Sequence, residues 1–420
     1  MTKHIANTKA LNIIVIVAAL GYFVDIYDLI LFGIVRIPSL NGLGITDPNL
    51  VTEYGHHLIS IQMIGMLVGG ILWGVMGDKK GRVSVLFGSI LLYSLANITN
   101  AYVLEIANFF GTSIIDTYSW LRFIAGVGLA GELGAGITLV NETMTKEHRG
   151  YGTMVVVSFG VLGAVFANIL GKYVTWQHSY IIGGVMGLVL LFLRIGVYES
   201  GMYAQVKEEK KTRGNFLMLF TDGKRFIKYL SCIAVGVPIW YMIGVLVVFS
   251  PEIAKAHGIE GVKGGDAIMY FYASTSGGDF LSAYWSQVWK SRRKVLLLFL
   301  VLSIISTPIY LYGLHGATPF LFYCVCAVLG FASGYWAVFV TVASEKFGTN
   351  LRATVTTTVP NMVRGSLAFL TALLAWFKDS WGLNTLDATM LVGVFAFSIA
   401  LASLFGIKET YAKDLNYTEE

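Results

Sequence analysis

Residues 58–104 read LISIQMIGMLVGGILWGVMGDKKGRVSVLFGSILLYSLANITNAYVL, two long apolar runs separated by the short segment Asp78–Arg82. Each run has about the 20 residues that a helix needs to cross the hydrocarbon core of a bilayer. The charges are confined to the connection between the runs, where a chain that turns back into the membrane meets water. This stretch therefore predicts two membrane helices joined by a tight, charged loop.

Ten further apolar runs of this kind occur along the chain. The twelve expected spans are 11–35, 58–77, 83–104, 118–140, 153–172, 180–198, 228–249, 267–288, 295–313, 318–342, 353–377 and 387–406. Hydrophobic residues make up 55% of the chain and charged residues only 13%, against about 25% charged in soluble proteins. The predicted fold class is thus an all-α membrane protein with twelve transmembrane helices.

The distribution of basic residues predicts the orientation in the membrane. Cytoplasmic loops retain Lys and Arg, and most of the 30 basic residues fall in cytoplasmic segments if the N-terminus is placed inside. We therefore expect a multi-pass protein of a bacterial-type inner (plasma) membrane, with both termini in the cytoplasm. The net charge of +5 then reflects topology, and we expect no nucleic-acid partner.

Two loops in the two halves of the chain resemble each other. Glu142 is followed after six residues by Arg149, and Glu345 is followed after six residues by Arg352. Such an internal repeat predicts two pseudo-symmetric six-helix bundles with a binding site between them. The expected division is a cytoplasmic tail (1–10), a first bundle (11–198), a cytoplasmic linker (199–227), a second bundle (228–406) and a second cytoplasmic tail (407–420).

The loop after the second span carries a family resemblance. Gly74-x-x-x-Asp78-Lys79-x-Gly81-Arg82 resembles the signature loop of the major facilitator superfamily, and Arg122-x-x-x-Gly126-x-Gly128 is similar to its motif in the fourth span. The resemblance implies the major facilitator fold, in which two halves alternately open a central site to either side. It also implies a gating role for residues of these loops: Gly74, Asp78, Lys79, Gly81, Arg82, Glu142, Arg149, Glu345 and Arg352.

We expect Asp78 to close the cytoplasmic side of the cavity. Its carboxylate should lie by the N-terminus of the eleventh span, near Arg352–Thr354, where the positive end of the helix dipole attracts an anion.

Narrower matches indicate a group of transporters. Asp25-x-Tyr27-Asp28 and Ala130-Gly131-Glu132 resemble motifs of metabolite:proton symporters, and sugar porters of the superfamily have a similar pair of Asp in the first span and Arg in the fourth. Phosphate transporters share the first pattern. Leu162 and Gly244, however, stand where those transporters have glutamine and aspartate, which argues against phosphate as the substrate.

Charged residues inside the spans are the candidates for proton coupling. Each costs about 2.5–3.5 kcal/mol at mid-membrane, so such residues face a cavity or one another. Asp28 and Arg122 lie at a similar depth by helical rise, and we predict that they pair, with Asp25 as the alternative partner of Arg122. The pair is either a coupling device or a static salt bridge. The coupling candidates are Asp25, Asp28, Arg122 and Glu132.

The remaining candidates are open between two or more roles. Glu132 is a protonation site, a substrate contact or a structural hydrogen-bonding group. Arg364 contacts an anionic substrate or a gate, or it is the partner of an internal acid. Asp279 is expected to pack between the halves rather than to take part in transport chemistry. Aromatic residues in membrane spans mostly serve packing, but those on spans that line the cavity in the family are candidates for substrate binding. Together with two polar residues of the eleventh span, the candidates for substrate binding are Trp240, Tyr241, Tyr335, Trp336, Asn361 and Arg364.

The predicted function is proton-coupled symport of a small polar metabolite, with an organic acid or a zwitterion favoured, by a monomer in the lipid bilayer. We expect no enzyme activity, no catalytic residues, no metal and no cofactor, because the sequence has no nucleophile–base constellation and no phosphate loop. The proton gradient is the driving force. A proton-antiport exporter of the same fold is the main alternative. A membrane receptor is another, but it needs a signalling domain, for which the 14 residues 407–420 are too few.

Overall fold

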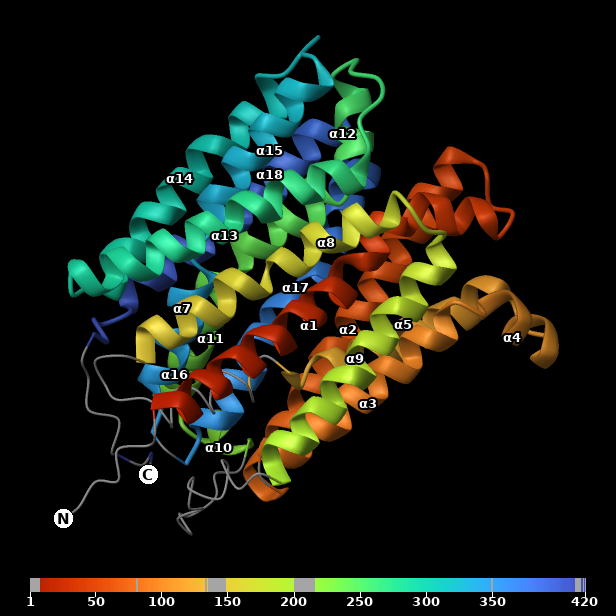
Figure 1. Ribbon diagram of the computed structural model, residues 1–420. Helices are drawn as coiled ribbons and strands as arrows, with labels where there is room; N and C mark the ends of the chain where they lie inside the picture. The colour runs from red at the N-terminus through yellow and green to blue at the C-terminus, as the bar shows by residue number, and fades with distance from the viewer. Residues whose placement is uncertain are drawn as a thin grey trace.

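The computed structural model describes residues 8–80, 82–132, 134, 149–199, 216–348, 350–411, 417 and 419. These described residues form helices and no strand (Figure 1). The first half of the chain contains α1 (Thr8–Gly42), α2 (Pro48–Lys80), α3 (Arg82–Asn100), α4 (Val103–Phe110), α5 (Ile114–Leu129), α7 (Arg149–Gly160), α8 (Leu162–Gly171) and α9 (Trp176–Glu199). The second half contains α10 (Met218–Thr221), α11 (Gly223–Tyr241), a π-helix (Met242–Val247), α12 (Ser250–Ala256), α13 (Gly264–Val288), α14 (Arg292–Tyr312), α15 (Pro319–Ser333), α16 (Trp336–Lys346), α17 (Arg352–Trp381) and α18 (Thr385–Gly406).

The twelve predicted spans are confirmed as helices or broken helices. Eight helical stretches of the described residues are long and apolar enough to cross a membrane. Five are the single helices α1, α2, α9, α14 and α18, and three consist of two consecutive elements: α7 with α8, α11 with the π-helix, and α15 with α16. The pair α3–α4, bent by 81°, passes the same test together. The other three spans are α5, α13 and α17. Of these, α13 and α17 carry the buried charged residues Asp279 and Arg364. The predicted end of the fourth span, 135–140, lies outside the described residues.

All spans run roughly along one axis, and the chain enters and leaves the bundle at the same end (Figure 1). We call this the near end: α1 begins there and α18 ends there. At the opposite, far end lie α12 and the short helix α4, which projects sideways from the bundle (Figure 1). An even number of crossings brings both ends of the chain to one side.

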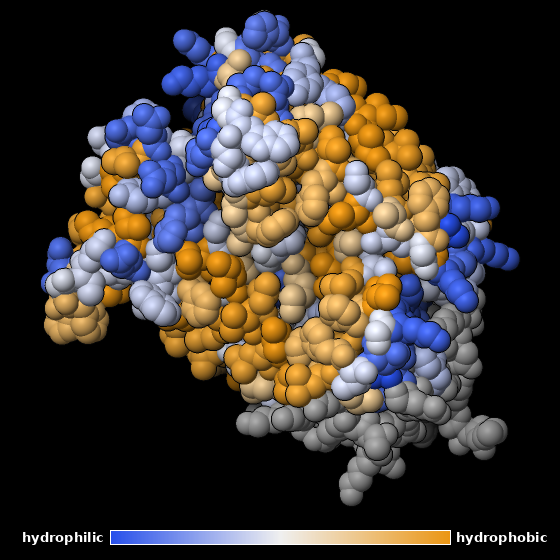
Figure 2. All heavy atoms as spheres, turned by 180° about the vertical axis from the view of Figure 1, so that it is seen from behind, coloured by the Kyte–Doolittle hydropathy of each residue, from blue (hydrophilic) through white to orange (hydrophobic). Residues whose placement is uncertain are grey.

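The surface of the bundle has the character of a membrane protein. Hydrophobic residues cover much of its flank, and hydrophilic residues gather toward the two ends (Figure 2). Large apolar side chains such as Phe192 on α9 and Phe405 on α18 are exposed, with 71% and 66% of their surface accessible. In water such a surface would associate, whereas lipid solvates it.

Glycines let neighbouring helices approach closely. A Cβ at Gly65 or Gly69 of α2 would clash with the backbone of Phe123 or Val127 on α5. In the second half, Gly330 of α15 meets the backbone of Phe271 on α13 in the same way. Because α2–α5 and α13–α15 are the second and fourth spans of each half, the same packing recurs in both halves.

The two halves of the chain meet along several helices. On one side α2 packs against α17, and on the other α7 and α8 pack against α13, while α1 lies in the middle and also contacts α13. The polar side chains considered next lie on or beside α1, α5, α9 and α17.

Candidate functional site

An ion pair joins the two halves of the chain at the centre of the bundle. Nη2 of Arg364 on α17 lies 3.8 Å from Oδ2 of Asp25 on α1, and the two side chains are 1% and 0% exposed. Trp336, the first residue of α16, covers the guanidinium, with 5.6 Å from Arg364 Cζ to the ring centroid. Of the two roles left open for Arg364, the structure shows it as the partner of an internal acid.

This ion pair is loose. A distance of 3.8 Å is too long for a hydrogen bond, and within the described residues neither Asp25 oxygen nor Arg364 Nε has a hydrogen-bond partner. Nη1 of Arg364 donates to Asn361 Oδ1 at 3.3 Å, and the hydroxyl of Tyr22 on α1 is a further hydrogen-bonding neighbour of the guanidinium. Buried charged groups stabilise a protein only when their remaining hydrogen bonds are satisfied, and in this pair those of Asp25 and of Arg364 Nε are not.

Asn361 connects α17 to the first half of the chain. Its Nδ2 donates to the backbone oxygen of Ala130, directly after α5, at 2.7 Å, and to Thr357 O at 2.9 Å. A Cβ at Gly70 of α2 would lie 2.7 Å from Asn361 Cβ. Asn361, a predicted binding residue, therefore lies beside Arg364 in the contact between halves.

Glu132 forms a second buried ion pair, which the sequence analysis missed. Arg194 of α9 donates from Nη1 to Glu132 Oε2 at 3.0 Å and from Nη2 to Oε1, and the two side chains are 4% and 1% exposed. Gly21 of α1 leaves room for the pair, because a Cβ there would clash with both partners. Nothing local in the sequence indicates this pairing, since Arg194 is 62 residues away from Glu132.

The predicted ion pair between Asp28 and Arg122 is wrong for this structure. Arg122 donates to the side chain of Gln62 on α2 and lies over the rings of Phe32 and Tyr180, at 5.3 and 5.5 Å from the centroids. The predicted alternative, Asp25 with Arg122, is not formed either, because Asp25 faces Arg364. Arg122 therefore has Gln62 and two aromatic rings as its neighbours, where an aspartate of α1 was expected.

Asp28 points in another direction. It is fully buried, and the amide of Asn97 on α3 lies close to its carboxylate without completing a well-aligned hydrogen bond. A Cβ at Gly183 of α9 would clash with its Oδ1. Asp28 therefore lies against α9, inside the first half of the chain.

The four aromatic candidates divide into two kinds. The hydroxyl of Tyr241 donates to Thr389 O at 2.9 Å, and that of Tyr335 donates to Val235 O at 3.1 Å. Both contacts lie within the second half and fix packing there. Trp240 is 3% exposed. Trp336 is the one whose ring covers Arg364, and in the described part of the chain its Nε1 has no acceptor.

Asp279 binds the break between α15 and α16. Its Oδ1 accepts the backbone N–H of Ala337 at 3.1 Å, at the start of α16. A carboxylate there satisfies a free N–H and meets the positive end of the helix dipole. This hydrogen bond lies within the second half, while α13 itself packs against α7 and α8 of the first half. The expectation that Asp279 packs between the halves stays a prediction.

The gating candidates are only partly within the described residues. Gly74 faces α17, where a Cβ would lie 3.2 Å from Thr358 Cγ2. Glu345 accepts from Thr410 Oγ1 at 2.9 Å and from Arg292 Nη2 at 3.5 Å, and Arg352 Nε donates to Ser344 O at 3.2 Å. The following lie outside the described part, by their side chains or altogether: Asp78, Lys79, Gly81, Arg82, Glu142 and Arg149. The proposed contact of Asp78 with α17 stays a prediction.

Further polar contacts join the halves at the far end, and sequence reasoning did not single them out. Arg36 of α1 donates to Glu252 of α12 at 2.7 Å. Lys172, directly after α8, pairs with Asp266 of α13 at 2.5 Å, and Asn168 donates to the same carboxylate at 3.0 Å. Among the described residues, no cluster of three or more His, Cys, Asp or Glu is suited to hold a metal ion.

Comparison with known proteins agrees with this geometry. The sequence model of the Major Facilitator Superfamily matches residues 18–372. A Haemophilus influenzae protein whose name assigns it to metabolite transport is 26% identical, over 95% of this chain and 96% of its own. A Bacillus subtilis protein named for niacin/nicotinamide transport is 24% identical, over 80% and 81%. The sialic acid transporter of Escherichia coli is 28% identical, over 54% of both chains.

Among solved structures, the proton:xylose symporter bound to 6-bromo-6-deoxy-D-glucose superposes with a TM-score of 0.72, at 15% identity, over 98% of each chain. At that identity the likeness concerns the fold. The relatives and the fold are those of transporters rather than enzymes. With twelve spans, a polar centre between two halves, and a sequence match over most of its length, the chain belongs to the Major Facilitator Superfamily.

Proposed function

We propose that this transporter carries a small organic anion together with a proton, by alternating access. The observation that carries the proposal is the buried pair of Asp25 and Arg364 across the two halves. An acid can bind and release a proton, and an arginine offers a planar set of donors that suits a carboxylate. In membrane spans such ionisable residues mark substrate and proton pathways.

The contacts between halves suit a site that opens alternately to the two sides. Arg36–Glu252 and Lys172–Asp266 join the halves at the far end, and Asp25–Arg364 joins them at the centre. The far-end contacts must break when the site opens there. Rocking of two bundles about a fixed central site achieves this without unfolding either bundle.

The proposed orientation places the near end in the cytoplasm. Basic residues are frequent there, as in the turn before α14 and its first residues: Lys290, Arg292, Arg293 and Lys294. Retention of Lys and Arg on the cytoplasmic side supports this assignment. The far-end contacts then form the outer gate of a bacterial-type inner-membrane protein.

The substrate class follows from the arginine. Two relatives carry names that refer to carboxylic acids, niacin and sialic acid, which supports an organic acid as the substrate of this chain. A zwitterion with a carboxylate is compatible with the same guanidinium. The aromatic cover of Trp336 over Arg364 suits a compact ligand with an apolar face.

Uptake into proteoliposomes tests the proposal. Purified protein is reconstituted at symmetric pH or with an acidic exterior, and accumulation of radiolabelled nicotinate and sialic acid is measured. The proposal expects accumulation that requires the inward proton gradient and disappears with a protonophore. A proton-antiport exporter, the alternative on this fold, would instead be driven by a gradient of the opposite direction, and that result would reject symport.

A further inference from the structure

We propose that Asp25 and the carboxylate of the substrate compete for Arg364, so that a proton on Asp25 makes the guanidinium available to the substrate. This inference rests on the proposed function, since it assumes an organic anion as substrate. It assigns the coupling role to Asp25 rather than to Asp28, and it predicts the charge that the site carries in each state.

The geometry of the ion pair supports competition. Asp25 approaches Arg364 to 3.8 Å without a hydrogen bond, and no group in the described residues accepts from Arg364 Nε. A carboxylate that binds an arginine side-on accepts two parallel N–H bonds at about 2.7–2.9 Å. A ligand carboxylate would therefore be bound better than Asp25 is, once Asp25 has lost its charge.

The charges that surround Asp25 leave Arg364 as its partner. Glu132, in the segment after α5, and Arg194, on α9, also lie near Asp25. These two side chains form an ion pair with each other through two hydrogen bonds. Asp28, on α1 itself, is a neighbouring acid. The other titratable or charged groups near this part of α1 are Tyr22 on α1, Tyr93 on α3, Arg122 on α5, and Tyr272 and Asp279 on α13. Arg364 is thus the described cation that Asp25 faces.

Two forms of the site are neutral. With Asp25 charged and paired, the negative and positive charges of the two side chains cancel. With Asp25 protonated and a monoanionic substrate on Arg364, the charges cancel again. A neutral site can be carried between the two sides without the cost of moving a net charge through a membrane.

The two uncoupled forms are charged. Substrate without a proton places two carboxylates around one guanidinium, and a proton without substrate leaves Arg364 unpaired in a buried position. A buried unpaired charge costs several kcal/mol. Competition for one arginine therefore enforces one proton per monoanion, and it makes transport electrically neutral.

A pair of isosteric ligands tests this directly. Nicotinate carries a carboxylate where nicotinamide carries a neutral carboxamide. The binding of each to the full-length protein is measured by thermal stabilisation from about pH 5.5 to about pH 8.5. Because one proton must bind with the anion, nicotinate affinity should fall by up to about tenfold per pH unit at the alkaline end. Nicotinamide has no charge to compete with Asp25, and its affinity should stay constant.

Asp25→Asn mimics the protonated acid. This variant should bind nicotinate equally well across the pH range, should exchange it between equal compartments, and should no longer accumulate it against a gradient. The matched control is Asp279→Asn, which also removes a buried carboxylate but at the start of α16. The control should retain the pH dependence of nicotinate affinity, even if its thermal stability falls.

Several outcomes would overturn the inference. Proton-driven uptake by the wild type combined with an unchanged pH dependence in Asp25→Asn would leave the proposed function standing and reject competition. Equal loss of pH dependence in Asp279→Asn would show that the effect is not specific to Asp25. Uptake that responds to membrane potential at zero pH gradient would contradict a neutral site. If neither nicotinate nor sialic acid binds at any pH, the organic-anion assignment fails, and this inference fails with it.

Discussion

Arg36 on α1 donates from Nη2 to Oε1 of Glu252 on α12 at 2.7 Å, across the boundary between the two halves of the chain. The same guanidinium lies 4.5 Å over the ring of Phe249, and on α2 the ring of His56 stacks on Phe249 at 3.6 Å. Arg36 is 1% exposed although it lies at the far end of the bundle. This charged contact at the far end is therefore supported by aromatic rings from both halves, in addition to the Lys172–Asp266 pair.

Glu252→Gln should shift the protein toward opening at the far end. A hydrogen bond to a charged group contributes about 1.5–3 kcal/mol, enough to change a population ratio by more than tenfold. Spin labels at the exposed positions 49 and 260, one in each half, should report a longer distance in the variant. Asp387→Asn, which removes a far-end acid bound to Tyr312 within the second half, should leave that distance unchanged. An unchanged distance in Glu252→Gln would show that this contact does not hold the gate.

Glu132→Gln should destabilise the protein more than it affects substrate recognition. The substitution leaves Arg194 buried and without its ion-pair partner, which typically costs about 3–5 kcal/mol. The measurement is thermal unfolding of the purified protein. The double variant Glu132→Gln/Arg194→Gln should recover part of the loss, because it removes the orphaned charge. Equal stability of the single variant and the wild type would show that the pair is not structural and would favour Glu132 as a protonation site.

Substitutions at two glycines of α2, Gly65 and Gly70, should distinguish an effect on folding stability from an effect on the relative motion of the two halves. Gly65→Ala places a Cβ against the Phe123 backbone within the first half, whereas Gly70→Ala places one 2.7 Å from Asn361 Cβ in the second half. We expect Gly65→Ala to lower the unfolding temperature and Gly70→Ala to keep it while slowing transport, because the halves can no longer close fully. Unfolding curves and uptake rates of both variants check this. A large loss of stability in Gly70→Ala would contradict the separation.

The carboxyl of Glu409 makes the stability of α14 depend on pH. Burial acts to raise its pKa, but hydrogen bonds from Ser291 and from three backbone N–H groups hold the pKa of Glu409 below its ordinary range. A carboxyl with a depressed pKa in the folded state contributes stability that is present above its unfolded pKa and lost as the pH falls through the folded value. Glu409→Gln should therefore unfold at a lower temperature than the wild type near about pH 7, and the difference should shrink below about pH 4. A difference that is independent of pH would contradict this role.

The fold could be predicted from the sequence because each membrane span is determined by the residues of that span alone. Twenty apolar residues need a helix in lipid whatever the neighbouring helices are. The broken helices were not predicted. The break between α15 and α16 depends on Asp279 of α13, which accepts the N–H of Ala337, and such a partner on another helix is invisible to a local reading.

The pairing of the buried charges needed information that the sequence does not contain. Depth along a helix follows from helical rise, and depth alone led to the expectation that Asp28 and Arg122 pair. Contact also depends on the direction in which each side chain leaves its helix. Three residues along a helix differ in direction by about 60°, and this separates Asp25, which faces α17, from Asp28, which faces α9.

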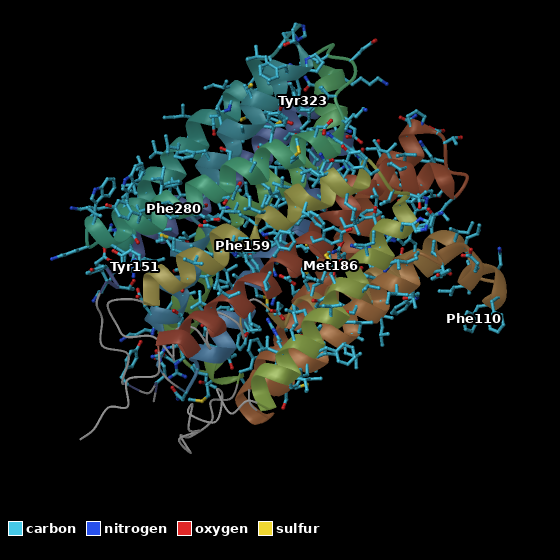
Figure 3. The ribbon with its side chains drawn as sticks, viewed as in Figure 1. Phe110, Tyr151, Phe159, Met186, Phe280 and Tyr323 are labelled. Atoms are coloured by element: carbon cyan, nitrogen blue, oxygen red, sulfur yellow. The ribbon has the colours of Figure 1, made fainter. Side chains whose placement is uncertain are left out.

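The helix α4 has a consequence for the membrane around the protein. It follows α3 at an angle of 81°, and Figure 3 places Phe110 at its tip, away from the bundle. Phe109 and Phe110 are 83% and 69% exposed, and aromatic rings at such a position rest among lipid headgroups. Because α4 belongs to the first half alone, tilting that half would press the arm into one leaflet or lift it out. The thickness and lateral tension of the bilayer would thereby shift the equilibrium between the two orientations of the halves through α4, which lies away from the proposed substrate site.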